Sequence, residues 1–383
     1  MNVQYDNQQT GLILAIPPHV MRLKVGGLDV TLRLTRQFKN AGVQGPVVWV
    51  VYKEEKASFI KEGIELVPFN RLSECLNSKT VKRWVFASGD LVFSGDGLKE
   101  AIKADGFSSF GFGVADFPSY TKLINWVEGV CLLKKQEPPT VGEIKMPHQR
   151  YFGYAKGPKE AKYLHTQILK HVARKQDPNF ARFTKRRFSN PLSVIFVQLG
   201  LSPNMVTACA ILSGVAGALM VMQMTYLWSI AGAMCLIISR ILDDCDGAVA
   251  RLSFRASRIG AIFDIAGDII VYTTLFVALG FSLYWQNPYG HHLWAMALLL
   301  FGAAVTTVII LWFVTDTKIR EESPLIATLE RTASGDVAYF FFPFALIDAH
   351  EVFLWSAAIG SQIYWMIISA SVFMYKHSKS KNR

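Results

Sequence analysis

The sequence lacks three features that would assign it to a common class of protein. It has no apolar leader, because MNVQYDNQQT is polar and the run GLILAI that follows is too short for a signal-peptide core. Its five cysteines are scattered without CxxC spacing, which argues against a disulfide framework or a cysteine zinc site. It contains no RNA- or DNA-binding motif. We therefore expect no nucleic-acid partner and a cytosolic N-terminal half.

Composition divides the 383 residues into two parts. Up to about Lys185 the chain is mixed and polar, whereas long apolar runs dominate from Pro203 onward. We predict an α/β cytosolic domain over 1–175, a linker with a juxtamembrane amphipathic helix over 176–202, and an all-α membrane domain over 203–383.

The second part contains six apolar segments. Each has close to the roughly 20 residues that a helix needs to span a bilayer. They are 204–222, 226–245, 260–284, 292–314, 335–349 and 352–375. The fifth is short and contains a proline. The sequence therefore predicts an integral membrane protein with six spans.

Basic residues indicate the orientation of these spans. The connections QMTYL, WQNPYGHH and DAHE contain no lysine or arginine, while the opposite side carries RFTKRRF, three arginines between 251 and 258, and KHSKSKNR. By the positive-inside rule, both termini and the loop after the second span are cytosolic. The net charge of +11 is then mostly a topology signal and an attraction to anionic lipid headgroups.

Five aspartates lie at the edge of this apolar sequence, in DDCDGAVARLSFRASRIGAIFDIAGD. Asp243, Asp246, Gly247, Ala250 and Arg251 have the spacing of one helix face. A second face carries Gly260, Asp264 and Asp268 at intervals of four. The eight residues between Arg251 and Gly260 allow a turn, so two antiparallel helices would bring the carboxylates together.

Carboxylates at close range repel one another unless cations lie between them. Mg²⁺ prefers a few carboxylates together with substrate phosphates, and two such ions can hold a diphosphate during displacement at phosphorus. The small residues Gly247, Ala250 and Gly260 allow a ligand to approach the backbone. The pattern predicts two Mg²⁺ or Mn²⁺ ions.

The same stretch fits D-x2-D-G-x2-A-R-x8-G-x3-D-x3-D at every fixed position, and in this it resembles the motif of the CDP-alcohol phosphatidyltransferase family. Upstream, SPNMVT is similar to the family's Pro-Asn-x-x-Thr. The resemblance covers about residues 180–376. It implies transfer of a phosphoalcohol group from a CDP-alcohol to an acceptor hydroxyl, with release of CMP, in phospholipid biosynthesis. It also implies a homodimer in the bilayer.

The resemblance implies a role for each motif residue. Asp243, Asp246 and Asp264 would be metal ligands, and Asp268 a further ligand or the general base, so that Asp264 and Asp268 carry the catalysis. The CDP site would be lined by Gly247, Ala250, Arg251, Gly260, Asn204 and Thr207. The arginines on the cytosolic side are candidates for binding an acceptor phosphate: Arg255, Arg258, Arg320 and Arg331. Asp244 lies off the helix face that carries Asp243 and Asp246. It is expected to be a solvated helix cap or to contact the metal ligands without binding the metal itself.

The N-terminal part alternates strand-like and helix-like runs, which predicts a mainly parallel sheet. GLILAI, VVWVVY, IELVPF, RWVFASGDLVF and SSFGFGVAD are the expected strands. Its pieces LILAI, LKVGGLDVTLRLTRQFKNAGV and ASGDLVF are similar to a nucleotidyltransferase domain. A cytidylyltransferase fused to a CDP-alcohol phosphotransferase is the architecture of enzymes that make inositol-phosphate lipid headgroups.

The first strand of this part is followed by IPPHVMRLK, where nucleotidyltransferases have a glycine-rich loop for phosphates. Its prolines remove donors, and Asp90 is left as a single carboxylate, which is a poor Mg²⁺ site. We expect a structural or regulatory domain in which Arg22, Lys24 and Asp90 are surface residues. Two alternatives stay open: a bifunctional enzyme that makes its own CDP-alcohol from CTP, and a transporter or scaffold that uses the motif for ion binding.

Overall fold

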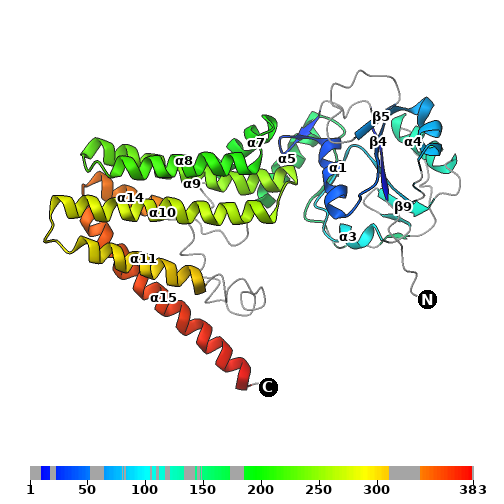
Figure 1. Ribbon diagram of the computed structural model, residues 1–383. Coiled ribbons are helices and arrows are strands. Elements are labelled where there is room, and N and C mark those ends of the chain that lie inside the picture. Colours follow the sequence, from blue (N-terminus) through cyan, green and yellow to red (C-terminus); the bar gives the residue numbers. More distant parts are fainter. Residues whose placement is uncertain are drawn as a thin grey trace. The chain divides into compact units, whose positions relative to one another are not determined.

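The computed structural model describes residues 10–17, 23–51, 64–79, 81, 83–103, 106–108, 112–116, 121–132, 143–144, 147, 149–172, 185–309 and 337–381 (Figure 1). Arg22, Arg320 and Arg331 lie outside these residues. The chain divides into two compact units. One contains 1–172 with 194–200 and 251–255, and the other contains 173–193, 201–250 and 256–383.

The N-terminal unit is built on a seven-stranded sheet in the order β10-β8-β9-β6-β1-β4-β5. Four neighbouring pairs are parallel, and β9 runs antiparallel to both β6 and β8. The strands are β1 (Gly11–Ala15), β4 (Val47–Val51), β5 (Ile64–Pro68), β6 (Arg83–Ser88), β8 (Gly106–Ser108), β9 (Phe112–Asp116) and β10 (Glu143–Ile144). The predicted α/β class with a mostly parallel sheet is confirmed.

Helices cover both faces of this sheet, which is why β1 and β4 are buried along their whole length. On one face Ile13 and Phe86 belong to the same buried cluster as Trp126 of α4 (Thr121–Cys131). On the other face the indole of Trp49 donates a hydrogen bond of 2.9 Å to Thr35 of α1 (Val30–Ala41).

Smaller elements complete the unit. They are β2 (Lys24–Val25), β3 (Leu28–Asp29), η1 (Phe69–Arg71), α2 (Leu72–Asn77), β7 (Leu91–Phe93), α3 (Leu98–Ala101), β11 (Phe152–Tyr154) and α5 (Pro158–Val172). β7 directly follows β6 and pairs with β11. The turn between β6 and β7 therefore presents Asp90 where the central sheet ends.

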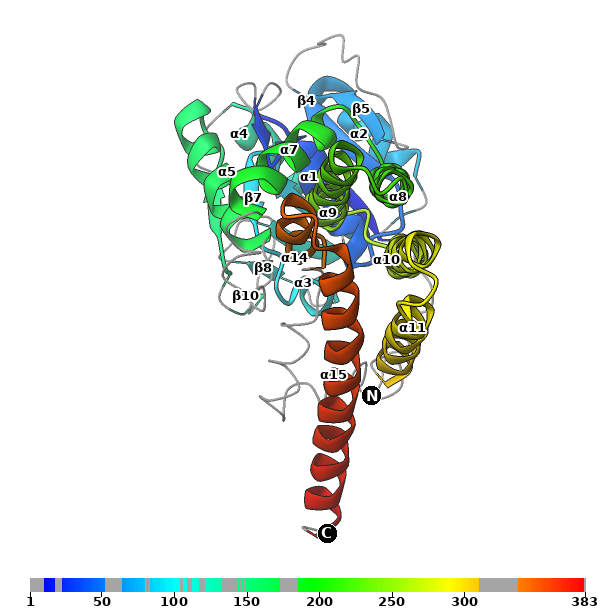
Figure 2. The same cartoon turned by 90° about the vertical axis from the view of Figure 1, so that its left-hand side faces the viewer.

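The second unit is helical. A π-helical turn, η2 (Lys185–Ser189), leads into α7 (Asn190–Gln198), whose residues from 194 onward are grouped with the first unit. The long helices are α8 (Pro203–Val221), α9 (Tyr226–Ser253), α10 (Arg258–Gln286), α11 (His292–Ile309) and α15 (His350–Lys381), and the short helix α14 (Val337–Leu346) precedes α15. α8 packs beside α10, and α11 beside α15, whose 32 residues make it the long helix at the C-terminal end (Figure 1, Figure 2).

Five of these helices are long and apolar enough to cross a membrane: α8, α9, α10, α11 and the part of α15 that ends at Met374. This unit is therefore a membrane-type domain. The fifth predicted span, 335–349, is observed as α14, whose ten residues reach only about 15 Å, half the thickness of a hydrocarbon core. Because 310–336 lie outside the described residues, the count of six spans stays a prediction.

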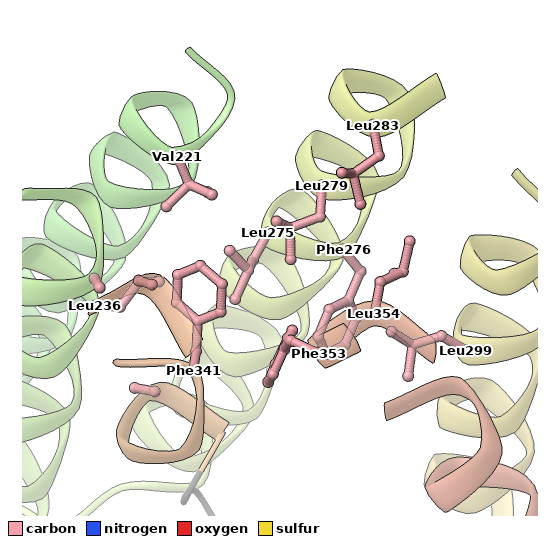
Figure 3. Close-up of a cluster of buried hydrophobic side chains, with 14 of the residues drawn as sticks. Val221, Leu236, Leu275, Phe276, Leu279, Leu283, Leu299, Phe341, Phe353 and Leu354 are labelled. Carbon is pink, nitrogen blue, oxygen red and sulfur yellow. The ribbon is translucent and has the colours of Figure 1, made fainter. Parts of the chain in front are cut away.

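The helical unit buries one apolar cluster between its helices (Figure 3). Leu275 of α10, Phe341 of α14 and Leu354 of α15 are fully buried there. By contrast, Leu212 on α8 is 70% exposed, as expected for a side chain that faces lipid. Gly217 and Gly232 let α8 and α9 approach closely, since a Cβ on either would lie within 2.7 Å of the other's carbonyl oxygen.

Candidate active site

The motif aspartates lie on two consecutive helices of the membrane-type unit. α9 runs unbroken through Asp243 and Asp246 to Ser253, and the chain turns at Phe254, which has a φ of 56°. α10 begins at Arg258, where the side chain of Ser257 accepts a hydrogen bond of 3.0 Å from the amide of Gly260. This N-cap fixes the start of the helix that carries Asp264 and Asp268.

Three carboxylates converge between these helices. Asp243, Asp246 and Asp264 each offer an oxygen, and the three oxygens lie within 4.8 Å of one another. Asp246 is buried, whereas Asp243 and Asp264 are half-buried. Carboxylate oxygens at this spacing are the donor set that Mg²⁺ and Mn²⁺ prefer, so the residues present fit a divalent cation.

Asp268 lies one turn beyond Asp264 and is more exposed than the three grouped carboxylates. Together with Asp243 it lines a small cavity of about 10 Å³, on the scale of one water molecule. The walls of this cavity also include Thr207, Ser239 and Tyr272. An exposed carboxylate beside the acidic group is well placed to accept a proton from an incoming hydroxyl.

The first turn of α8 orients Asp246. The hydroxyl of Thr207 lies 2.5 Å from Oδ2 of Asp246 and 3.1 Å from the carbonyl oxygen of Pro203. Because an ionised carboxylate can only accept hydrogen bonds, the hydroxyl of Thr207 donates its hydrogen to Asp246. Thr207 itself is 4% exposed. The family resemblance implies that Thr207 lines the CDP site, whereas the observed contact of its hydroxyl is to a motif carboxylate.

Two other residues assigned to the CDP site lie together. A Cβ on Gly260 would stand 3.2 Å from Oδ1 of Asn204, so the absence of a side chain leaves room for that amide. Gly247 and Ala250 are half-buried on α9, and Arg251 is exposed at the last turn of this helix. Arg255 and Arg258 are exposed at the turn that follows.

Sequence reasoning missed Arg240, one turn before the motif on α9. Its guanidinium pairs with Oδ2 of Asp243 through Nη1, and Nη2 lies 3.1 Å from Oδ1 of Asp244. The side chain of Asp244 is only 5% exposed, so this residue is not a solvated cap. The signal was present, because an arginine in the apolar run SIAGAMCLIISR stands three and four residues before two aspartates.

Among the described residues of the N-terminal unit, Asp90 is a buried carboxylate at the end of the sheet. It is 5% exposed and accepts a hydrogen bond from the hydroxyl of Ser88, so the expectation of a surface residue is wrong for Asp90. Burial, together with the Asp90 carboxylate, raises the pKa of Tyr154. Among the residues described for the chain, the acidic group that could hold a metal is the one on α9 and α10, and it does not include Asp90.

Two helices of the membrane-type unit bring three aspartates together and so define an acidic centre among helices that are long and apolar enough to cross a membrane. The sequence profile of the CDP-alcohol phosphatidyltransferase family matches residues 200–375. This part of the chain is therefore similar to the CDP-alcohol phosphatidyltransferase family.

Curated relatives match a shorter stretch. The phosphatidylinositol phosphate synthase of Mycobacterium marinum is 36% identical over 93 residues, which are 24% of this chain and 39% of that protein. The Mycobacterium bovis protein of the same name is 32% identical over 108 residues, or 28% of this chain and 48% of that protein. The chain thus spans less than half the length of these relatives.

Solved structures are also similar to part of the chain. A crystal structure of Mycobacterium tuberculosis phosphatidylinositol phosphate synthase with CDP-DAG bound shares 23% sequence identity with a TM-score of 0.35, and covers 49% of this chain and 94% of that one. A structure of the same protein with manganese and citrate has a TM-score of 0.34 at 23% identity, and covers 48% of this chain and 88% of that one.

Proposed function

We propose that the helical unit is a transferase that moves a phosphoalcohol group from a CDP-alcohol to an acceptor hydroxyl and releases CMP. The observation that carries this proposal is the convergence of Asp243, Asp246 and Asp264 within 4.8 Å, inside the segment that matches the family profile. The relatives' name supports a phosphatidylinositol phosphate as the class of product.

Asp243, Asp246 and Asp264, with Asp268 as a fourth candidate, would hold two Mg²⁺ or Mn²⁺ ions. When bound, such ions neutralise a diphosphate and stabilise the attacking and leaving oxygens at phosphorus. Without a cation, buried carboxylates this close together would repel one another, so the cluster itself favours cation binding. The hydroxyl of Thr207 holds the carboxylate of Asp246 in place.

The remaining residues then have separate tasks. Asp268 takes the proton of the acceptor hydroxyl. The oxygen of that hydroxyl forms a bond to the β-phosphorus of the donor, and the bond between this phosphorus and the oxygen of CMP breaks. Gly247, Ala250 and Gly260 leave space for the CDP group, and Asn204 with Arg251 orients it. Arg255 and Arg258, both exposed at the turn between α9 and α10, are the described candidates for binding an acceptor phosphate.

We infer further properties from the sequence. The distribution of basic residues supports cytosolic termini and a cytosolic active site, and the family resemblance supports a homodimer. The N-terminal unit is proposed to be a nucleotidyltransferase-like domain without nucleotidyltransferase activity, because the described residues place Asp90 at the end of its sheet without a second carboxylate in a metal-binding group.

The substitutions Asp246→Asn and Asp264→Asn test the proposed reaction. Each removes a charged metal ligand at nearly constant volume, and we expect loss of Mn²⁺-dependent CMP release from a panel of CDP-alcohols and acceptors. Asp348→Asn is the matched control, because Asp348 is exposed and precedes α15, far along the chain from the motif. Unchanged turnover in the first two variants would refute the proposal, and a wild-type protein that binds metal but consumes no CDP-alcohol would favour the transporter or scaffold.

The bifunctional alternative is tested on the full chain. Incubation with CTP and a set of phosphoalcohols should release no pyrophosphate. Pyrophosphate release that is lost on Asp90→Asn would show that the N-terminal unit makes the donor.

A further inference from the structure

Arg240 stands out among the described residues of α9. It lies one turn before Asp243 in a helix that is apolar enough to span a bilayer, and its side chain is only 12% exposed. A guanidinium in such a place is costly unless its charge is paired and its donors are used. Its partners are two aspartates on the same helix, at i+3 and i+4.

The ion pair of Arg240 includes one of the three grouped carboxylates, that of Asp243. Asp243 contributes an oxygen to the group of three carboxylates and also pairs with Nη1 of Arg240 through Oδ2. The second guanidinium nitrogen lies 3.1 Å from Asp244, whose side chain is 5% exposed. The rigid, planar guanidinium therefore links one predicted ligand to a buried carboxylate outside the group, which restricts how the side chain of Asp243 can turn.

We propose that Arg240 is a positioning residue for the metal centre, and that Asp244 is the counter-ion that keeps Arg240 in place. This inference rests on the proposed function, because it assumes that Asp243 is a metal ligand. Residues that bind the side chain of a metal-coordinating residue set the orientation of that side chain, and their loss commonly weakens metal binding 10- to 100-fold.

The charges of the site agree with this role. The five aspartates between 243 and 268, counted with the buried Arg240, leave four negative charges, which two divalent cations would balance. Arg251, Arg255 and Arg258 are exposed and are not included in this sum. Direct binding of Arg240 to a substrate phosphate is less compatible with the geometry, because the cavity that Arg240 lines has room for about one water molecule.

The informative variant is Arg240→Met combined with Asp244→Asn. It removes one positive and one negative charge, so the net charge of the site is unchanged and the buried charge of Asp244 is not left unpaired. Asp243 keeps its carboxylate and loses the guanidinium that restrains it. Arg240→Lys keeps the charge but offers no planar fork, and should give an intermediate effect. The control is Arg150→Met with Asp96→Asn, which removes a more exposed ion pair at 2.8 Å in the N-terminal unit and makes the same change in charge.

Mn²⁺ binding to the purified protein, measured by the electron paramagnetic resonance signal of free Mn²⁺, is the primary readout. We expect a 10- to 100-fold higher dissociation constant in the double variant, a smaller increase in Arg240→Lys, and no change in the control. A double variant that folds and binds Mn²⁺ within twofold of wild type would overturn the proposal. If the double variant does not fold, Arg240→Lys decides in the same way.

A second readout separates positioning from substrate contact. At saturating Mn²⁺ the KM for the CDP-alcohol should be unchanged in the variants, whereas a raised KM with unchanged Mn²⁺ binding would overturn the proposal in favour of donor binding. Failure of the proposed function is seen independently, since wild-type protein would then bind Mn²⁺ but release no CMP.

Discussion

Replacing Thr207 by valine removes the hydrogen bond to Asp246 and keeps the shape of the side chain. The bond joins a buried hydroxyl to a buried carboxylate over 2.5 Å. Hydrogen bonds to charged groups contribute about 1.5–3 kcal/mol, which corresponds to a factor of roughly 10 to 150. If that free energy is used to orient a metal ligand, the Mn²⁺ concentration for half-maximal CMP release should rise by about this factor.

The control for this prediction is Thr274→Val on α10. The hydroxyl of Thr274 donates a hydrogen bond of 2.7 Å to the carbonyl oxygen of Ile270, four residues earlier. The hydroxyl of Thr207 lies in the same way near the carbonyl oxygen of Pro203, also four residues earlier. Thr274→Val therefore reproduces the loss of a helix-backbone contact without a carboxylate. Thr207→Ser should keep near wild-type activity. Equal Mn²⁺ requirements in Thr207→Val and wild type would refute the orienting role.

Two further predictions concern packing and reactivity. Gly232→Val should lower the free energy of unfolding of the helical unit by about 1–3 kcal/mol, because the Cβ of the valine would lie 2.5 Å from the carbonyl oxygen of Gly217. The measurement is the loss of the helical circular-dichroism signal on heating in detergent. An unchanged unfolding midpoint would contradict the close approach of α8 and α9. Burial, together with the neighbouring carboxylate of Glu65, raises the pKa of the Cys75 thiol to about 11, so the thiolate forms only as the pH rises towards that value. Alkylation of Cys75 by iodoacetamide, followed by mass spectrometry from pH 7 to 11, should therefore remain slow below pH 10, and a half-maximal rate near pH 8.5 would be inconsistent with it.

The sequence was most informative where spacing alone decides the geometry. Intervals of three and four residues placed Asp243 with Asp246, and Asp264 with Asp268, on helix faces, and the structure brings three of these four carboxylates into one group. Short apolar runs likewise predicted β1, β4 and β6, because buried strands of a parallel sheet are largely apolar. The edge strand β5 was also predicted, although it is only partly buried.

Other features depend on contacts between distant parts of the chain. The run SSFGFGVAD was predicted as a strand and contains β9, but it includes only Ser108 of β8. The antiparallel pairing of β8 with β9 was not predicted, because the direction of a strand is set by its partners and not by composition. α14 is too short for the predicted span, and hydropathy could not separate a ten-residue apolar helix from a longer one. The contact of Thr207 with Asp246 joins residues 39 positions apart, which no local pattern reports.

Diffraction from crystals grown with Mn²⁺, recorded near the manganese absorption edge, would locate the bound metal ions. We expect anomalous density among the carboxylates of Asp243, Asp246 and Asp264, and none at Asp90. Strong anomalous density elsewhere, with these three carboxylates turned apart or held only by basic side chains such as Arg240, would contradict this expectation.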